Sequence, residues 1–171
     1  MGHALLLVDV QKNMLEGVNP VPGAEHLRPV LQSLLHAARK ANTVVVHVQN
    51  NGESDEPDAP GTPGWDLVFT PNETELVIQK TQGDAFYDSG LAAWLRAHQV
   101  DEVVIAGMQS EFCIRDTARG ALANGFGVIL VSDAHATYGA SPRDASQIAR
   151  SVEEELAQKC VRIVGADQVG F

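Results

Sequence analysis

The sequence predicts an α/β fold in three layers, with a largely parallel six-stranded sheet between two layers of helices, as in Rossmann-like proteins. Short apolar, β-rich runs alternate with helical patterns from one end of the chain to the other. The first run, Ala4–Val8, is apolar at every position, which is typical of a central parallel strand covered on both faces. A chain of 171 residues is long enough for one full core, so we expect a single domain over residues 1–171.

In the first half of the chain, a helix is predicted after Pro22-Gly23, because its apolar residues recur with i, i+3 and i+4 spacing. The second and third strands are predicted at Val44–Val48 and Glu75–Gln79. Between them, Asn50–Asn72 contains four prolines and three glycines, which predicts a long loop rather than a helix. Loops of this length are commonly lids or binding loops, and the alternative is an insertion or interface arm.

In the second half, three short apolar runs predict further strands, at Val103–Ala106, Val128–Val131 and Val161–Val164. Apolar spacing over Leu91–Leu95 predicts one helix, and a second is predicted from Glu111 to about Asn124. The last long helix is expected to begin with Ser141 as its N-cap and Pro142 at its first helical position.

Composition excludes several classes of partner. The net charge of −10 argues against binding to nucleic acid or to an anionic membrane. The two cysteines, Cys113 and Cys160, are far apart and suggest neither a disulfide framework nor a zinc knuckle, so a cytoplasmic location is expected. The N-terminus has no secretory pattern, and no run approaches the ~18 apolar residues of a membrane span. No GxGxxG motif follows the first strand, which disfavours a dinucleotide site.

Three reactive side chains follow predicted strands, where ligands bind in an open parallel sheet. Asp9 follows the first strand, Lys80 the third and Cys113 the fourth. With Ser110 as a helix N-cap, Cys113 would be the third helical residue, and the helix dipole there would favour its thiolate. Asp9 could remove the thiol proton, and Lys80 could stabilise the thiolate. The alternative for Cys113 is a buried structural cysteine.

The residues around these three positions resemble the isochorismatase-like cysteine hydrolases, a superfamily that includes nicotinamidases and related amidases. The resemblance runs from Leu5 to about Val164. Three motifs in the same order carry it: Leu7-Val8-Asp9-Val10-Gln11, Val77-Ile78-Gln79-Lys80, and Gly107-Met108-Gln109-Ser110-Glu111-Phe112-Cys113-Ile114 with Thr117. A further match, Val131-Ser132-Asp133-Ala134, comes with the fifth strand. It implies a catalytic triad of Asp9, Lys80 and Cys113 and a cis peptide at Met108–Gln109. It also implies an oxyanion hole formed by the backbone amides of Gln109 and Cys113.

The chain departs from the metal-dependent nicotinamidases, which carry Asp-x-His after the second strand. That position reads His47-Val48-Gln49-Asn50-Asn51, and the Asn50–Asn72 loop has no histidine. We therefore predict no metal and no cofactor, and do not expect nicotinamide to be the physiological substrate. His47 is interpreted as a hydrogen-bonded strand residue, whereas His135 has two open alternatives, a pocket role and a structural hydrogen bond.

The predicted activity is hydrolysis of the C–N bond of a small amide through a thioester, in a homodimer or higher homo-oligomer. Pockets for such substrates are mostly apolar, and the apolar candidates near the motifs are Met14, Trp65, Phe86, Tyr87 and Phe112. Plain core packing is the alternative for these five. Two other functions remain open, a vinyl ether hydrolase of the isochorismate type and a non-catalytic thiol sensor or binding module.

Overall fold

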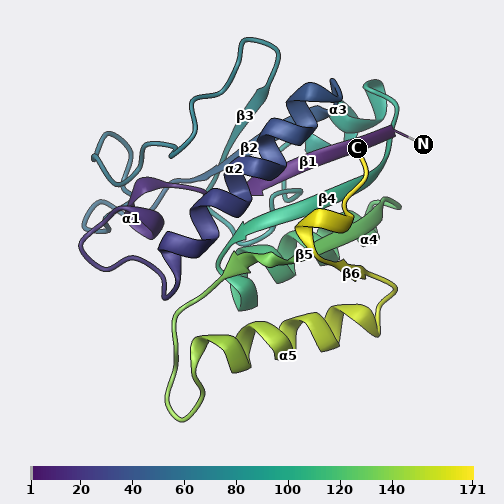
Figure 1. The fold of residues 1–171 in the computed structure, drawn as a ribbon. Helices are drawn as coiled ribbons and strands as arrows, with labels where there is room; N and C mark the ends of the chain where they lie inside the picture. The colour runs from purple at the N-terminus through teal and green to yellow at the C-terminus, as the bar shows by residue number, and fades with distance from the viewer. Residues whose placement is uncertain (1) are drawn as a thin grey trace.

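A single sheet organises the computed structural model, which describes residues 2–171 (Figure 1). Its six strands are β1 (Gly2–Val8), β2 (Val44–Asn50), β3 (Leu76–Lys80), β4 (Val100–Met108), β5 (Gly127–Ala136) and β6 (Arg162–Val164). They lie in the order β3-β2-β1-β4-β5-β6, and every neighbouring pair is parallel. The predicted α/β class and six-stranded parallel sheet are therefore confirmed.

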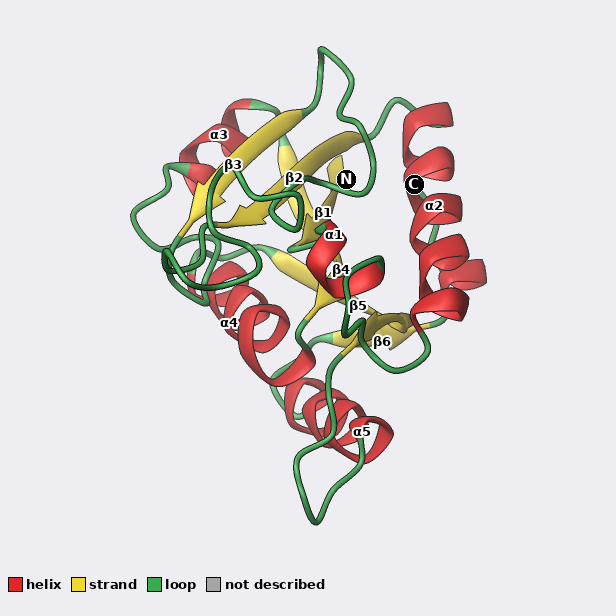
Figure 2. Ribbon diagram, turned by 90° about the vertical axis from the view of Figure 1, so that its left-hand side faces the viewer, coloured by secondary structure: helices red, strands yellow, loops and turns green. Residues whose placement is uncertain are grey.

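Helices cover both faces of this sheet. They are α1 (Lys12–Leu15), α2 (Ala24–Lys40), α3 (Leu91–Ala97), α4 (Arg115–Ala123) and α5 (Ala145–Ala157), with a π-helical turn η1 (Ser110–Ile114) and a 3₁₀ turn η2 (Ala166–Gln168). Helix α2 lies on one face, and α3, α4 and α5 lie on the other (Figure 2). Leu5 and Leu7 of β1 pack in the core under α2, while Leu6 and Val8 pack in the opposite core. This explains why Ala4–Val8 of β1 is apolar at every position. Within residues 2–171, no helix is long and apolar enough to cross a bilayer.

Two helix starts differ from the sequence prediction. Ser110 does not cap a helix: it is the first residue of η1, and its Oγ lies 2.8 Å from Nδ1 of His135. Cys113 is consequently the fourth residue of a π-helical turn rather than the third of an α-helix. Helix α5 begins at Ala145, because the Asp144 carboxylate accepts the Gln147 N–H at 2.8 Å and completes a capping box. Ser141 and Pro142, joined by a cis peptide, lie in the turn before it.

The strand order of the sheet reverses between β1 and β4. The chain passes from β1 outward to β2 and β3, then returns across β1 to β4, β5 and β6. In such sheets the carboxyl ends of the two central strands leave a crevice open to ligands. The long loop is attached beside it, because Val68 N–H donates to the Val10 carbonyl at 3.0 Å and Lys12 N–H to the Asp66 carbonyl at 2.9 Å. The loop thus forms one side of the crevice.

Candidate active site

Lys80 lies at the centre of a buried polar cluster. Its Nζ is 3.0 Å from Asp9 Oδ2, 3.2 Å from Cys113 Sγ and 3.2 Å from Asn50 Oδ1. Asp9 and Lys80 are almost fully buried, and Cys113 is half-buried. The structure thus brings together Asp9 after β1, Lys80 at the end of β3 and Cys113 in the turn after β4, the three residues that the sequence analysis singled out.

The backbone at the ends of β1 and β4 positions two of these residues. Asp9 has a left-handed φ of 51°, which aspartate tolerates better than most residues, and its N–H donates to the Val48 carbonyl at 2.9 Å. The chain turns there, so the carboxylate is held at the strand end. Gly107, with φ of 128°, lies so close to β1 that a Cβ would collide with the Val8 carbonyl oxygen. Only glycine allows this approach, which brings η1 and Cys113 next to Asp9.

The turn that carries Cys113 is held from two sides. The cis peptide implied by the family resemblance is present at Met108–Gln109, and the Gln109 carbonyl accepts from the Ile114 N–H at 3.1 Å. His135 fixes the other side, with Nδ1 2.8 Å from Ser110 Oγ and Nε2 3.1 Å from Glu153 Oε1 of α5. Of the two alternatives for His135, the structure therefore supports the structural hydrogen bond.

Burial dominates the electrostatics of Cys113. Burial and then the Asp9 charge raise the pKa of the thiol, Lys80 only partly opposes them, and the pKa lies at about 12 as a result. Burial also raises the pKa of Asp9, against the opposing effects of Lys80 and of hydrogen bonding with Cys113. For Lys80, burial lowers the pKa, but attraction to Asp9 and Cys113 outweighs it and leaves the pKa raised. The resting site thus has a neutral thiol beside an ammonium, contrary to the expected thiolate, because desolvation exceeds the effects of the turn and of Lys80.

One oxygen of Asp9 is free to accept a proton. Oδ2 accepts a hydrogen bond from Lys80, whereas Oδ1 is buried and has no hydrogen-bond partner among the nitrogen and oxygen atoms of residues 2–171. An unpaired carboxylate oxygen in a dry site is costly unless a proton is within reach. The arrangement can therefore hold a thiol proton on the carboxylate while the ammonium stabilises the sulfur.

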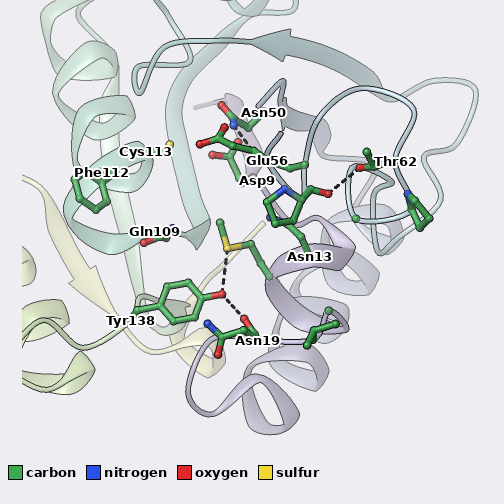
Figure 3. Close-up of a pocket in the computed structure, with 17 residues that line it drawn as sticks. Asp9, Asn13, Asn19, Asn50, Glu56, Thr62, Gln109, Phe112, Cys113 and Tyr138 are labelled. Atoms are coloured by element: carbon green, nitrogen blue, oxygen red, sulfur yellow. Dashed lines mark hydrogen bonds between the residues drawn. The ribbon is translucent and has the colours of Figure 1, made fainter. Parts of the chain in front are cut away.

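A cavity of about 740 Å³ opens onto this cluster. Its lining includes Asp9, Cys113 and Gln109, and Asp9 and Cys113 lie on the side of the cavity away from Tyr138 (Figure 3). Of the five apolar residues expected in the pocket, Met14 of α1 and Phe112 of η1 line it. The cavity is large enough for a small amide with a substituent of several atoms.

The other three expected pocket residues lie elsewhere, each for a physical reason. The indole of Trp65 is held by a hydrogen bond from Nε1 to Asn51 Oδ1 at 2.8 Å, outside the lining of the cavity. Phe86 packs in the core, with its ring centroid 5.7 Å from that of Phe126. Tyr87 is 66% exposed on the outer surface.

Sequence reasoning missed Asn50 and the acidic part of the loop. Asn50 ends β2, accepts from Lys80 through Oδ1, and donates from Nδ2 to Asp58 Oδ2 at 2.8 Å. Asp58 and Glu56 both line the cavity. The sequence could have indicated Asn50, because it follows the predicted strand Val44–Val48 and so lies at the same end of the sheet as Asp9 and Lys80.

The counterpart of the nicotinamidase metal motif has a structural role in this chain. His47 is buried, and its Nε2 lies 2.9 Å from Glu75 Oε2, as expected of a hydrogen-bonded strand histidine. Arg39 donates to the same carboxylate at 2.7 Å. Within residues 2–171, no group of three or more His, Cys, Asp or Glu side chains is arranged to hold a metal ion.

The fold and the site define a class of α/β protein in which a buried Asp–Lys pair faces a cysteine at the switch point of a parallel sheet. Residues 3–158 match the isochorismatase domain, and the chain belongs to the isochorismatase family. A streptothricin hydrolase of Streptomyces noursei is 46% identical over 138 residues, which cover 80% of this chain and 50% of that protein. The chain thus spans about half the length of this relative.

Solved structures agree with the family assignment. A putative isochorismatase hydrolase from Oleispira antarctica superimposes with a TM-score of 0.90 at 26% identity, covering 98% of this chain and 95% of that one. The pyrazinamidase of Pyrococcus horikoshii in complex with zinc gives a TM-score of 0.84 at 25% identity, covering 96% and 99%. The family resemblance stated from the motifs is therefore confirmed.

Proposed function

We propose that this protein hydrolyses the C–N bond of a small amide through a thioester on Cys113, with Asp9 as the proton carrier and Lys80 as the stabilising cation. One observation carries the proposal: Lys80 Nζ lies 3.0 Å from Asp9 Oδ2 and 3.2 Å from Cys113 Sγ, beside a cavity that both of these partners line. The names of two similar proteins, streptothricin hydrolase and pyrazinamidase, support the same reaction class.

The first step forms the thioester. As Cys113 sulfur attacks the amide carbonyl, the thiol proton moves to Asp9, whose Oδ1 has no other partner among the described residues. The pKa of about 12 keeps the thiol neutral until a carbonyl is in place, and Lys80 stabilises the charge that develops between sulfur and carboxylate. The oxyanion would be held by the backbone amides of Gln109 and Cys113, both on the cavity wall. Asp9 then gives its proton to the leaving nitrogen, and the C–N bond breaks.

The second step releases the acid. A water molecule gives a proton to Asp9 and attacks the thioester carbonyl. The C–S bond breaks, the carboxylic acid leaves, and Asp9 returns its proton to the sulfur. Asp9 therefore carries a proton in each half of the cycle, and the site ends in the state in which it began.

The neutral thiol disfavours the sensor alternative. Reaction with oxidants requires the thiolate, and burial raises the pKa of Cys113 to about 12. A vinyl ether hydrolase needs no thiol at all, so substitution of Cys113 separates that activity from amide hydrolysis.

The test is a panel of small amides, scored for release of ammonia or amine by wild type and Cys113→Ala. We expect Cys113→Ala to lose roughly a thousandfold or more in turnover, as removal of a nucleophile does elsewhere. Cys160→Ser is the matched control, because Cys160 is exposed and lies outside the cavity lining, and it should keep wild-type turnover. Amide turnover that survives in Cys113→Ala would exclude the thioester route.

A further inference from the structure

The charges around the cavity point to the kind of amide that fits it. Three carboxylates line the cavity, those of Asp9, Glu56 and Asp58, and among residues 2–171 no lysine, arginine or histidine lines it. Lys80 lies behind Asp9 and Cys113, and the three donors of its ammonium already face Asp9, Asn50 and Cys113. A substrate carboxylate would therefore find no free cation and would be repelled by the lining.

Glu56 and Asp58 form a pair of negative charges on the loop side of the cavity. Their oxygens, Glu56 Oε2 and Asp58 Oδ1, approach the same point, because a Cβ added at Gly52 would collide with both. Asp58 is buried, and in the part of the chain that the structure describes neither carboxylate forms a salt bridge. Each carboxylate accepts one hydrogen bond, Glu56 Oε2 from the Glu53 N–H and Asp58 Oδ2 from Asn50, both at 2.8 Å, but neither is neutralised by a cation of the described residues, so a cationic ligand would be attracted to the pair.

Two buried oxygens in the lining also lack N–H and O–H donors. Within residues 2–171, Oδ1 of Asn13 has no hydrogen-bond partner, and Oδ1 of Asp9, whose side chain is only 4% exposed, has no nitrogen or oxygen partner, although the Asp9 carboxylate hydrogen-bonds with the Cys113 thiol. Both oxygens are hydrogen-bond acceptors, so an occupant that pairs with them must bring N–H or O–H groups. Asp9, Asn50 and Glu56 lie together on one side of the cavity (Figure 3). An occupant would therefore place its hydrogen-bond donors close to the Cys113 thiol.

We propose that the substrate of this site is an amide that also carries a protonated amine, and that Glu56 and Asp58 bind that amine while Cys113 attacks the carbonyl. This inference rests on the proposed amide hydrolysis and adds the charge of the substrate to it. Asn50 holds the Asp58 carboxylate in place by donating a hydrogen bond from its side-chain amide to Asp58 Oδ2 at 2.8 Å. Glu56 is exposed at the surface of the loop, so it can meet an incoming ammonium before the cavity is filled.

The inference is tested with primary amides of matched chain length that end in an ammonium, a methyl or a carboxylate group, followed by ammonia release. We expect kcat/KM to be highest for the ammonium series and lowest for the carboxylate series, with roughly tenfold or more between them. Glu56→Gln and Asp58→Asn should each reduce the preference for ammonium over methyl by roughly tenfold, mainly through KM. Asp55→Asn is the matched control: it removes a charge from the same loop outside the cavity lining, and the preference should persist.

Binding to Cys113→Ala, measured by calorimetry, separates this inference from the catalytic proposal. An ammonium amide that binds more tightly than its methyl counterpart supports the inference even if turnover fails. If instead no amide of any charge is hydrolysed by wild type, the proposed function falls. Equal binding of the ammonium and methyl amides, or tighter binding of the carboxylate, overturns the inference while leaving hydrolysis untouched. A calcium titration that binds wild type but not Glu56→Gln would reassign the carboxylates to a metal and also overturn it.

Discussion

At the scale of single residues, burial and two neighbouring charges together set the pKa of Cys113. Burial and the Asp9 carboxylate raise its pKa, and Lys80 lowers it. The balance favours a neutral thiol, so the proposed mechanism requires the proton to pass to Asp9 as the sulfur attacks. The separate contributions of Asp9 and Lys80 can be measured by removing each charge in turn.

We predict that Lys80→Met and Asp9→Asn change the reactivity of Cys113 in opposite senses. Without Lys80 the thiol pKa rises further, and without the Asp9 charge it falls, in each case by the ~1–3 units typical of a neighbouring charge. Alkylation by iodoacetamide at neutral pH should slow by roughly tenfold or more in Lys80→Met and accelerate in Asp9→Asn. Amide turnover should be lost in both.

The comparison is made in a Cys160→Ser background, so that Cys113 is the sole remaining thiol. There the alkylation rate of the parent protein should rise about tenfold per pH unit through the neutral range, because the thiol pKa lies far above it. A plateau near neutral pH would mean that the thiol is already ionised. Equal alkylation and turnover in Lys80→Met and its parent would remove Lys80 from the site.

At the scale of elements, the start of α5 shows how one side chain fixes a helix boundary. Asp144 accepts the Gln147 N–H at 2.8 Å, and the Gln147 side chain accepts the Asp144 N–H at 3.0 Å. These reciprocal bonds satisfy backbone donors that the first helical turn leaves unpaired. Ser141, which the sequence pattern favoured as the cap, is exposed in the preceding turn.

We predict that Asp144→Ala lowers the urea midpoint of unfolding and that Ser141→Ala does not. The hydrogen bonds from Gln147 and Ser146 hold the pKa of Asp144 below its usual range. A carboxylate with a depressed folded-state pKa stabilises above its unfolded pKa, and this contribution is lost as pH falls through the folded pKa. The difference between Asp144→Ala and wild type should therefore narrow in acid. A larger effect of Ser141→Ala would restore Ser141 as the cap.

At the scale of the whole molecule, the sheet was predictable because apolar runs mark its central strands. Ala4–Val8 and Val44–Val48 are predicted within one or two residues of β1 and β2, since strands buried on both faces need apolar residues throughout. The end of β5 was not predictable in this way. Strand β5 continues through polar residues to Ala136. Backbone pairing with Gly107 and Met108 of β4 extends it there, and not the burial of apolar side chains.

The cavity was harder to predict than the residues at the strand ends. Asp9, Lys80 and Cys113 lie at or just after the carboxyl ends of nearby strands, so the topology of the sheet already brings them to the same place. The lining depends on how a long loop folds back, which hydrophobicity does not determine. Trp65 illustrates this, since its Nε1 donates to Asn51 and its carbonyl accepts from Gln11 at 3.0 Å. Polar partners therefore decided the placement of an aromatic residue that the sequence suggested for the pocket.

We predict that chelators leave amide turnover unchanged. The side chains of residues 2–171 offer no group of three or more His, Cys, Asp or Glu that could hold a metal, and His47 is engaged by Glu75. Overnight treatment with EDTA, followed by assay with and without added zinc, measures this. Activity that disappears in EDTA and returns with zinc would show that polar side chains of this protein bind a metal ion needed for turnover.

The central claim is that Cys113 becomes acylated during turnover, and acid quenching of the reaction followed by peptide mass mapping tests it most directly. A slowly hydrolysed amide is mixed with wild type, Cys113→Ala and Cys160→Ser, and the quenched proteins are digested. The account predicts that the acyl mass appears on the peptide containing Cys113 in wild type and Cys160→Ser, is removed by hydroxylamine, and is absent from Cys113→Ala, which does not turn over. Amide hydrolysis by Cys113→Ala at the wild-type rate would contradict it.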